Sequence, residues 1–467
     1  RLPQVGAAAI YCRWMIHRPP YRLIFPPSPL CRGIRMKKLL FVALCGMTMT
    51  GFAVAADWPQ WRGPNHDDIS KETGLLKSWP EGGPKLLWTF REAGEGYSGP
   101  AIVGDTLYCM GADDKNDHIY ALDLKTQTKK WSTPVGPRLN LDRGDGPRGT
   151  PFVDGDLVFG LGSQGNLICV KASTGDKVWL QPLYDGKDFK DNKWWKDQMA
   201  SQWGYSESPL VDGDQVVCTP GGKNGTMAAF NKKTGEPIWR TKEWTDNAAY
   251  SSIVAAEIGG VHQYVKMTDS TIAGVSPKDG TILWRFARQA NITIPTPIVS
   301  GDYVFVCSGY GVGDTLLKIA KDGGKFKADE VYSDKDMVNH HGGVVLVDGN
   351  LYGYSDGKKW LCKEMISGKV LWPKGKDESK LGKGSLTCAD GCFYCYSEDD
   401  GTVALVQVSP EGWKEKGRFN VPEKSKTHAT KNGGKFWTHP VISNGKLYLR
   451  DKELLWCYDV KGGTASR

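Results

Sequence analysis

The sequence predicts an all-β fold, an eight-bladed β-propeller of four-stranded antiparallel blades. One short phrase recurs along the chain, in which two apolar runs are followed by a Gly-containing turn and then a Trp. The opening runs of eight such units lie 43 to 58 residues apart, which is close to the length of a propeller blade. A partial unit stands at each end of the repeats, so the N- and C-terminal strands are expected to share one blade.

The units are aligned on their opening runs. In the clearest units Thr174-Gly175 precedes Trp179, and Thr234-Gly235 precedes Trp239. Turns such as Asp154-Gly155-Asp156 separate two alternating apolar runs, which is a β-hairpin signal. The chain therefore reads as strand after strand with almost no helix. The eight opening runs begin at Gly99, Thr150, Ser208, Ser252, Thr296, Gly342, Ser385 and His439.

The two incomplete units complement each other. The eighth unit stops soon after Leu454 to Asp459, which leaves no room for its outermost strand. The segment Pro84 to Phe90 resembles the end of a unit whose beginning is absent. Pairing these segments closes the ring and removes the exposed strand edges of an open array. We therefore expect a closed propeller at 84–462, preceded by an N-terminal strap at 57–83 and followed by a tail at 463–467.

Residues 1–56 have the character of a targeting region. From Met36 the chain has two lysines, an apolar run and an Ala-Val-Ala end, which predicts a secretory signal peptide at 36–56. Residues 1–35 are rich in Pro and Arg and do not begin with Met, so a non-native extension of the reading frame is expected; an unusually long targeting region is the alternative. Leu44 before Cys45 is too bulky for a lipid-anchor site. The mature protein is expected to start near Ala56 or Asp57, in the periplasm or at the cell surface.

Charge argues against a nucleic-acid partner. The formal charge is +8, but residues 1–56 hold eight Lys and Arg and no acidic residue, so the remainder has 52 residues of each sign. A protein without a basic excess lacks the electrostatic attraction that nucleic acid requires. The apolar run before Asp57 is also too short and wrongly flanked for a membrane-spanning helix.

Nine cysteines follow Asp57, and most recur at equivalent strand positions. Recurrence at one strand position is typical of small, packed core residues, so free thiols are favoured over a disulfide framework. Cys392 and Cys395 have CxxC spacing, but residues three apart on a strand point to opposite faces and make a poor metal pair.

The residues Ala121 to Trp131 are a near copy of the tail A-x-D-x-x-T-G-x-x-x-W, and with the other units they resemble the pyrroloquinoline-quinone-like (PQQ-like) propeller repeats. The segment Asp57 to Asn65 looks like the N-terminal signature of secreted, planctomycete-type members. The resemblance covers nearly all of 84–462. It implies an eight-bladed propeller but several activities: quinoprotein alcohol dehydrogenases, outer-membrane assembly factors of the BamB type and sensor regions of kinases.

In such propellers the Trp of the tail packs between neighbouring blades, which is a structural task for a large apolar side chain. The fifth and seventh units lack this Trp and have Tyr332 and Phe419 near the expected places. The residues assigned to blade docking are Trp88, Trp131, Trp179, Trp239, Trp284 and Trp372.

A candidate site follows from the fold. The first strand of each blade lines the central channel, and the preceding loops open on one face, where their side chains converge. The alternative is that these side chains satisfy one another and the channel backbone around ordered water. On an extended segment His340 and His341 would face opposite ways, so only one is expected to point into the channel. The candidate ligand-binding residues are Arg148, Glu207, Tyr250, His341, Lys383, Trp437 and His439.

The Trp-rich insertion at 187–203 is a second feature of this face. It is expected either to form a short helix over the channel mouth, as a lid or a partner-binding knob, or to pack as a loop on the propeller rim.

The sequence assigns neither a catalytic residue nor a metal site. A quinone cofactor of the dehydrogenase type requires Ca²⁺, which takes six or more oxygen ligands, and only Glu207 and Asp145 are obvious carboxylates at the channel mouth. The vicinal Cys-Cys pair that the resemblance implies for those enzymes does not occur. The cofactor stays unknown, with PQQ and Ca²⁺ as an alternative that no matched motif supports.

The leading functional hypothesis is an exported module that binds a protein partner or a small anionic or sugar-like ligand at the channel face. Arg148 and Lys383 suit an anionic ligand through charge-assisted hydrogen bonds. A PQQ-dependent oxidoreductase of alcohols or sugars is the first alternative, and a BamB-like outer-membrane assembly scaffold is the second.

Overall fold

The computed structural model describes residues 56–140, 145–184, 194–199, 201–375, 377–429 and 434–462. The predicted extension at 1–35, almost all of the predicted signal peptide at 36–56 and the tail at 463–467 lie outside these ranges. No helix of the described part is long and apolar enough to cross a membrane.

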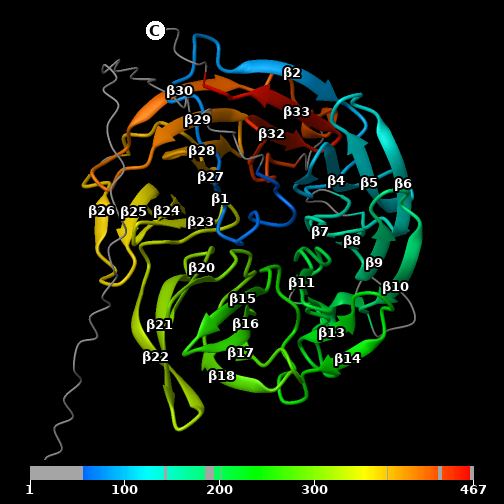
Figure 1. The fold of residues 1–467 in the computed structure, drawn as a ribbon. Helices are drawn as coiled ribbons and strands as arrows, with labels where there is room; N and C mark the ends of the chain where they lie inside the picture. Colours follow the sequence, from blue (N-terminus) through cyan, green and yellow to red (C-terminus); the bar gives the residue numbers. More distant parts are fainter. Residues whose placement is uncertain are drawn as a thin grey trace, which may run out of the picture. The chain divides into compact units, whose positions relative to one another are not determined.

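The described chain forms eight antiparallel sheets arranged as blades around a central channel, which confirms the predicted propeller (Figure 1). In seven of the eight sheets the strands follow in chain order from the channel outward, and in the eighth β2 lies outside β33. Blade 1 consists of β3 (Ala101–Val103), β4 (Thr106–Ala112), β5 (Asn116–Asp123) and β6 (Lys129–Pro137), and blade 2 of β7 (Phe152–Asp154), β8 (Leu157–Leu161), β9 (Asn166–Lys171) and β10 (Lys177–Pro182). Blade 3 consists of β11 (Leu210–Asp212), β12 (Gln215–Cys218), β13 (Ala228–Asn231) and β14 (Pro237–Arg240). Blade 4 consists of β15 (Val254–Ile258), β16 (Val261–Met267), β17 (Thr271–Val275) and β18 (Ile282–Ala287).

The second half of the ring repeats this pattern with two additions from the N-terminal segment. Blade 7 gains β1 and blade 8 gains β2. Blade 5 consists of β19 (Ile298–Ser300), β20 (Tyr303–Ser308), β21 (Gly313–Asp322) and β22 (Lys325–Asp334), and blade 6 of β23 (Val344–Val347), β24 (Asn350–Ser355), β25 (Lys359–Glu364) and β26 (Val370–Trp372). Blade 7 consists of β1 (Ile69–Ser70), β27 (Gly384–Ala389), β28 (Cys392–Ser397), β29 (Thr402–Gln407) and β30 (Glu415–Asn420). Blade 8 consists of β31 (Val441–Ser443), β32 (Lys446–Asp451), β33 (Leu454–Asp459) and β2 (Lys85–Phe90).

The ring closes as the two incomplete units predicted. β2 pairs antiparallel with β33, with Lys85 opposite Asp459 and Phe90 opposite Leu455. The last blade therefore takes three strands from the end of the chain and its outermost strand from the beginning. Closure gives every blade a neighbouring blade on both sides.

The core of the propeller is divided among the blade interfaces. Eight hydrophobic clusters occur in the described part, and each joins two neighbouring blades. The cluster that joins the last blade to the first contains Tyr448 and Leu455 together with Leu107 and Tyr120. Because each blade buries its two faces against its neighbours, stability depends on the whole ring.

The tail Trp and the turn Gly of the next blade form one contact. The indole N–H of Trp179 donates to the carbonyl of Lys232 at 2.9 Å, and Gly235 lies against the ring of Trp179 with a φ of 76°. Trp131 makes the same contact with Ala172 and Gly175. A Cβ on Gly235 would lie 2.7 Å from the indole, so only glycine fits both the backbone conformation and the space.

Where the Trp is absent, other aromatic side chains take its place. The hydroxyl of Tyr332 donates to the carbonyl of Met365 at 2.8 Å, and Gly368 lies against its ring. Phe419 of blade 7 packs against Gly83, which immediately precedes Pro84 and β2. The outermost turn of blade 8 is thus also supplied by the N-terminal segment.

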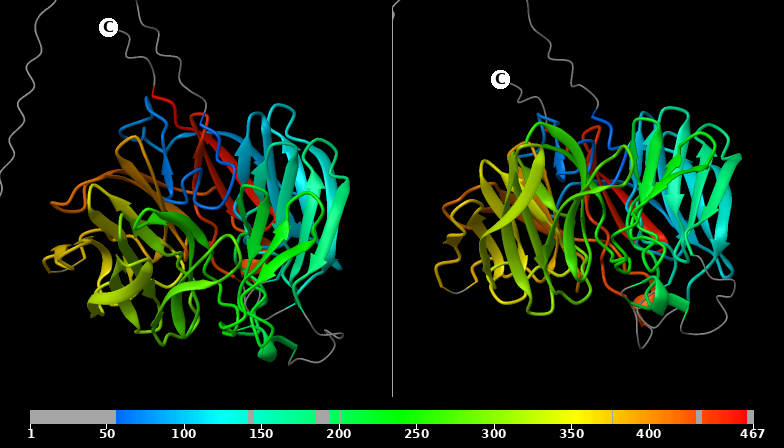
Figure 2. Two further views of the ribbon diagram at one scale, coloured as in Figure 1. Left: turned by 60° about the horizontal axis from the view of Figure 1, so that its bottom comes forward. Right: turned by 90° about the horizontal axis from the view of Figure 1, so that it is seen from below.

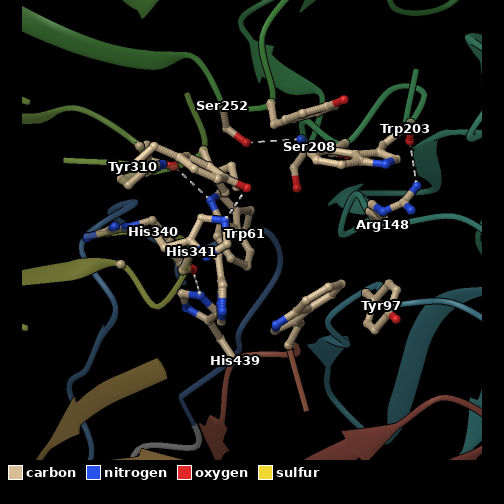
Figure 3. A pocket seen from close by; sticks show the side chains of 18 residues that line it. Trp61, Tyr97, Arg148, Trp203, Ser208, Ser252, Tyr310, His340, His341 and His439 are labelled. Carbon is tan, nitrogen blue, oxygen red and sulfur yellow. Dashed lines mark hydrogen bonds between the residues drawn. The ribbon is translucent and has the colours of Figure 1, made fainter. Parts of the chain in front are cut away.

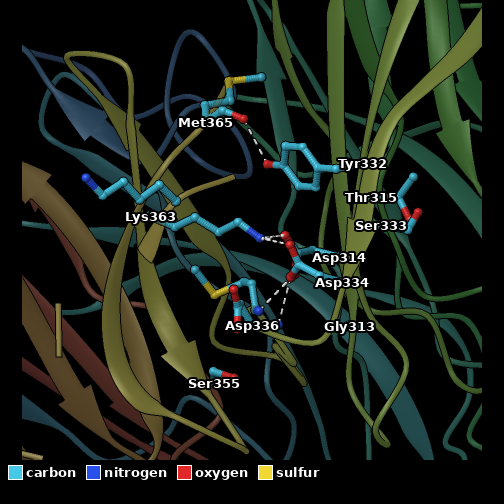
Figure 4. Close-up of polar contacts among 12 residues, drawn as sticks. Gly313, Asp314, Thr315, Tyr332, Ser333, Asp334, Asp336, Ser355, Lys363 and Met365 are labelled. Atoms are coloured by element: carbon cyan, nitrogen blue, oxygen red, sulfur yellow. Dashed lines mark hydrogen bonds and ion pairs between the residues drawn. The ribbon is translucent and has the colours of Figure 1, made fainter. Parts of the chain in front are cut away.

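A buried ion cluster joins blades 5 and 6 (Figure 4). The ammonium of the fully buried Lys363 lies 2.6 Å from Oδ2 of Asp314 and 2.6 Å from Oδ2 of Asp334. It also lies 4.6 Å from the ring centroid of Tyr332. Burial and a hydrogen bond with Asp334 raise the pKa of Asp314 to about 7. One ammonium therefore serves two carboxyl groups, of which Asp314 is the one that holds a proton more readily.

The N-terminal strap does more than close the ring. β1 pairs parallel with β27, the innermost strand of blade 7, so this sheet has five strands where the repeats predicted four. Oδ1 of Asp57 accepts from the N–H of Gly104 in the β3–β4 turn, while Trp61 lies at the central cavity (Figure 3). Positive φ values at Arg62, Gly63 and Asp68 make the tight turn by which the strap reverses. The strap thus begins beside the β3–β4 turn of blade 1 and reaches the channel, and Figure 1 shows β1 near the centre of the ring.

The nine cysteines of the described part are free and buried, as predicted. Cys392 and Cys395 belong to different hydrophobic clusters, one on each face of blade 7, so their side chains do point apart. Two single-turn 3₁₀ helices, η1 (Trp194–Asp197) and η2 (Lys426–Ala429), lie on one face of the propeller (Figure 2). η1 lies in the insertion at 187–203, of which 187–193 and 200 lie outside the described residues.

Candidate functional site

The loops that precede the innermost strands surround a cavity of about 190 Å³ on the channel axis (Figure 3). Five of the seven candidate residues line it, namely Arg148, Tyr250, His341, Trp437 and His439. Glu207 and Lys383 do not. The further lining residues include Trp61, Arg62, Tyr97, Trp203, Ser208, Ser252, Thr296, Tyr310 and His340.

Aromatic rings make up much of the cavity wall. The ring centroids of Tyr97 and Trp437 are 5.1 Å apart, and those of Trp203 and Tyr250 are 6.3 Å apart in a stacked arrangement. Trp61 packs 4.6 Å from the ring of His439, and its indole N–H donates to Thr296 at 3.0 Å. Rings held by such contacts present fixed apolar faces to the cavity.

Two cations lie against Tyr97 at one side of the cavity. The Arg148 guanidinium is 5.8 Å from the Tyr97 ring centroid and donates to the carbonyl of Trp203 at 2.7 Å. The Lys452 ammonium is 3.8 Å from the same centroid and donates to the Tyr97 hydroxyl at 2.5 Å. Burial raises the pKa of Tyr97 and lowers that of Lys452 to about 8. Of the two cations only Arg148 lines the cavity, and Glu95, Asp451 and Asp145 lie near Lys452.

His341 is held by an acidic partner behind the wall. Nε2 of His341 hydrogen-bonds to Oε2 of Glu398, which also accepts from the indole N–H of Trp437 at 3.0 Å. Burial by itself would raise the pKa of Glu398, but these hydrogen bonds and the nearby positive charges lower it to about 2. Since Glu398 occupies Nε2, the buried Nδ1 of His341 has no partner among the described residues.

His439 connects the cavity to the strap. Its Nε2 donates to the carbonyl of His341 at 3.0 Å, and its Nδ1 lies 3.8 Å from Oδ2 of Asp68. Burial lowers the pKa of His439 to about 3, so the ring is neutral near pH 7. Burial raises the pKa of Asp68 to about 6, although Arg62, with Nε 3.2 Å away, opposes the shift. His341, His439, Asp68 and Arg62 thus lie next to one another at the wall of the cavity, while Nδ1 of His439 and Oδ2 of Asp68 form no hydrogen bond with the described residues.

The expectation that only one of the two adjacent histidines faces the channel is wrong, because both line the cavity. The chain bends at 340–342 and is not extended there, so alternation of side chains does not apply. The ring centroids of His340 and His341 are 5.0 Å apart. Nε2 of His340 hydrogen-bonds to the hydroxyl of Tyr310 at 3.1 Å.

Glu207 lies away from the cavity. It is 1% exposed, its Oε2 lies 3.0 Å from the Lys266 ammonium, and it accepts from the hydroxyl of Thr219 at 2.7 Å. The carboxylate neutralises a fully buried lysine between blades 3 and 4, and leaving that lysine unpaired would be costly. Glu207 is therefore a structural ion-pair residue in this structure.

Lys383 does not line the cavity but contacts His340, which does. Its ammonium lies 2.6 Å from Oδ1 of Asp356 and 3.0 Å from Nδ1 of His340. It fixes the ring of His340 and has no surface on the cavity.

The alignment of the repeats could not have found three of the lining aromatic residues. Trp61 comes from the strap, whose path into the channel is not encoded in the repeats. Trp203 is the last residue of the insertion, which the other units lack. Tyr310 lies in the β20–β21 loop, outside the loops that precede the first strands. The one sequence signal for Trp61 and Trp203 was the concentration of Trp in 58–61 and 194–203.

The lining residues do not fit a Ca²⁺-bound quinone. Ca²⁺ takes carboxylate and carbonyl oxygens, and no carboxylate is among the described residues that line the cavity. Glu207, a carboxylate that the sequence placed at the channel mouth, is already paired with Lys266. No group of three or more His, Cys, Asp or Glu suited to a metal occurs in the described part of the chain.

A family model described as outer membrane protein assembly factor BamB matches residues 70–186 and 138–374. The outer membrane protein assembly factor BamB of Burkholderia pseudomallei is 33% identical over 357 residues, which span 70% of this chain and 80% of the relative. That of Shewanella oneidensis is 26% identical over 292 residues, 60% of this chain and 67% of the relative.

Among solved structures, a europium-containing methanol dehydrogenase has a TM-score of 0.57 at 14% identity, covering 84% of this chain and 89% of that chain. This likeness shows the fold alone. Together with the family model and the repeats, the relatives show that the chain belongs to the PQQ-like β-propeller family of the outer membrane protein assembly factor BamB.

Proposed function

We propose that this protein is an exported binding module whose channel cavity holds a small sugar-like ligand with an acidic group. The observation that carries the proposal is the composition of the wall: aromatic faces, two arginines and three histidines, with no carboxylate among the described lining residues. A concave site with a few polar groups between aromatic side chains is the usual form of a small-ligand site.

The chemistry of the wall matches a sugar ring. Trp437, Trp203 and Tyr250 offer flat apolar faces for the C–H faces of a pyranose, and the hydroxyl of Ser208 lies beside them in the lining. Arg148 can pair with a carboxylate, since its guanidinium lies in the lining.

The test is calorimetric titration of the chain from Asp57 with glucuronate, galacturonate and their neutral parent sugars. Saturable binding of the acids is expected, and Arg148→Gln should weaken it roughly ten- to hundred-fold, because a charge-assisted hydrogen bond contributes about 1.5–3 kcal/mol. The neutral sugars should be affected little by this change. Trp437→Ala should weaken both classes.

Arg91→Gln is the matched control, since this exposed arginine pairs with Glu423 on the surface and should leave binding unchanged. No heat with any sugar at millimolar concentration, or an affinity for the acids that Arg148→Gln leaves unchanged, would refute the proposal. A parallel titration with PQQ, with and without Ca²⁺, separates the oxidoreductase alternative, which requires Ca²⁺-dependent saturation.

A second candidate is a BamB-like assembly scaffold, favoured by membership of the family whose model is described in those words. A scaffold would bind a protein partner through the propeller surface. Its partner should remain bound when Trp437 or Arg148 is replaced, and it should be lost when residues of the rim are changed. Pull-down with the mature protein and these two variants distinguishes the two functions.

A further inference from the structure

A second, smaller pocket of about 80 Å³ lies between blades 6 and 7, and its chemistry is the opposite of the channel cavity. Its aromatic wall is formed by Trp360 at the start of β25, Trp372 at the end of β26 and Trp413 in the β29–β30 turn. β26 is the outermost strand of blade 6, so this pocket lies at the outer part of the ring, apart from the channel (Figure 1).

The three indoles form a corner. The ring centroids of Trp372 and Trp413 are 6.4 Å apart with planes at 82°, and those of Trp360 and Trp413 are 5.7 Å apart at 45°. Rings set at such angles offer π-faces on two sides of the same space.

The indole N–H groups are all used within the protein. Trp360 donates to the carbonyl of Gly382 at 3.1 Å, Trp372 to that of Ser409 at 2.9 Å, and Trp413 to Oε2 of Glu415 at 3.1 Å. The pocket therefore gains no N–H donor from its indoles, and what these rings offer to a ligand is the electron-rich π-system.

The charged residues of the lining are mainly acidic. Asp377, Glu378 and Glu411 line the pocket against one basic residue, Lys374. Asp377 is used in part by Ser379, whose N–H and hydroxyl donate to its Oδ1 at 2.9 and 2.6 Å. Glu411 pairs with Lys414. The exposed Glu378 forms no hydrogen bond or ion pair with any other described residue.

We infer that this pocket binds an organic cation, a guanidinium or alkylammonium group. A cation over the faces of Trp rings gains quadrupole attraction, and carboxylates at the edge of the pocket add charge complementarity. Two sources carry this chemistry: a free small solute, or an Arg or Lys side chain of a partner protein. This inference does not depend on the ligand proposed for the channel cavity.

The experiment uses the mature protein with its tryptophans labelled as 5-fluorotryptophan and observed by ¹⁹F NMR. The Trp413 resonance is assigned by its absence from Trp413→Phe. Tetramethylammonium chloride and arginine amide are titrated separately, with sodium chloride at equal ionic strength as the reference. A saturable shift of the Trp413 resonance that sodium chloride does not reproduce is the expected result.

Glu378→Gln should weaken this binding at least several-fold, and since the residue is exposed the variant should fold normally. Glu236→Gln, which removes an exposed carboxylate from the β13–β14 turn of blade 3, is the matched control and should leave the affinity unchanged. If Trp413→Phe does not fold, the affinities of Glu378→Gln and Glu236→Gln for the cations still show whether the cation binds at this pocket.

The two sources are separated by a third titration with a short arginine-containing peptide capped at both ends. A shift with the peptide as well as with the free cations indicates a side chain of a partner, and a shift with the free cations alone indicates a small solute. No shift beyond that of sodium chloride, or equal affinities of Glu378→Gln and Glu236→Gln, would overturn the inference.

Discussion

At the residue scale, the channel is built from buried ionisable side chains whose protonation is fixed by their surroundings. Burial lowers the pKa of His66 to about 4 and those of His340 and His439 to about 3. These imidazoles are neutral in the folded protein near pH 7. Each one resists protonation in the fold but takes a proton readily in the unfolded chain, whose His pKa is near 6.5.

Stability is therefore predicted to fall as the pH drops below about 6.5. Between that value and the folded pKa near 3, the unfolded state binds a proton at His439 that the folded state does not, so protonation favours unfolding. At pH 5 this amounts to about 2 kcal/mol for a single such histidine. Asp68, whose pKa is raised to about 6, opposes the trend because it gains its proton on folding. Urea unfolding of the wild type and His439→Asn from pH 8 to pH 5 measures the effect.

His439→Asn should show a smaller loss of stability on acidification, since asparagine keeps an N–H donor for the carbonyl of His341 but does not titrate. His262→Asn is the control: this histidine is 43% exposed, and its two acidic neighbours, Asp212 and Glu257, raise its pKa despite partial burial. Equal slopes of stability against pH for His439→Asn and the wild type would contradict the interpretation.

At the element scale, five of the eight blade junctions pair a tail aromatic residue with a turn glycine of the next blade. The contact repeats from Trp131 with Gly175 through Trp179 with Gly235 and Trp239 with Gly280. It combines a hydrogen bond from the indole with a close approach that excludes any Cβ. The sequence phrase of turn and Trp thus encodes two contacts, one with each neighbouring blade.

Two glycines of blade 3 give a matched test. Gly213 has a φ of 57° and nothing within 4 Å of its missing Cβ, whereas Gly235 has a φ of 76° and the Trp179 indole at 2.7 Å. Gly213→Ala should cost about 1–2 kcal/mol for the left-handed conformation alone. Gly235→Ala should cost about 1–3 kcal/mol more, because the indole must move. Chemical unfolding of both variants measures the difference, and equal losses would show that the contact with Trp179 is not tightly packed.

At the scale of the whole molecule, the ring depends on a segment that lies outside the repeats. Residues 57–90 supply β2 to blade 8, β1 to blade 7 and Trp61 to the cavity. One stretch of chain therefore closes the ring and completes the candidate site. Loss of this stretch should affect stability and ligand binding together.

A chain that begins at Arg91 is predicted to lose cooperative unfolding and to self-associate, since β33 would be left with an unpaired edge. The chain from Asp57 is the reference. Light scattering after size exclusion and thermal unfolding measure the two effects. A synthetic peptide covering Pro84 to Phe90, added to the shorter chain, should reduce the self-association by pairing with β33. A monomeric shorter chain with an unchanged Tm would disprove the role of closure.

The sequence by itself determined the number of blades, their strand order and the closure through 84–90, and it predicted the face on which the candidate site lies. These features are local or periodic: turns, alternating apolar runs and tail aromatic residues recur in each unit, so their meaning can be learned by comparing units. The same periodicity indicated that Arg148, Tyr250 and Trp437 lie near one another, because equivalent loops converge on the channel.

Only the tertiary structure decided which side chains reach the cavity. Glu207 stands at an equivalent loop position, but its carboxylate pairs with the ammonium of Lys266 and not with the cavity. A buried ammonium without a counter-charge would destabilise the fold strongly, so this pairing decides where the side chain points. Trp61 enters from a non-repeated strap, whose path no period encodes. Where a side chain points within a loop is settled by burial and charge pairing across blades distant in sequence, and one sequence does not display these contacts.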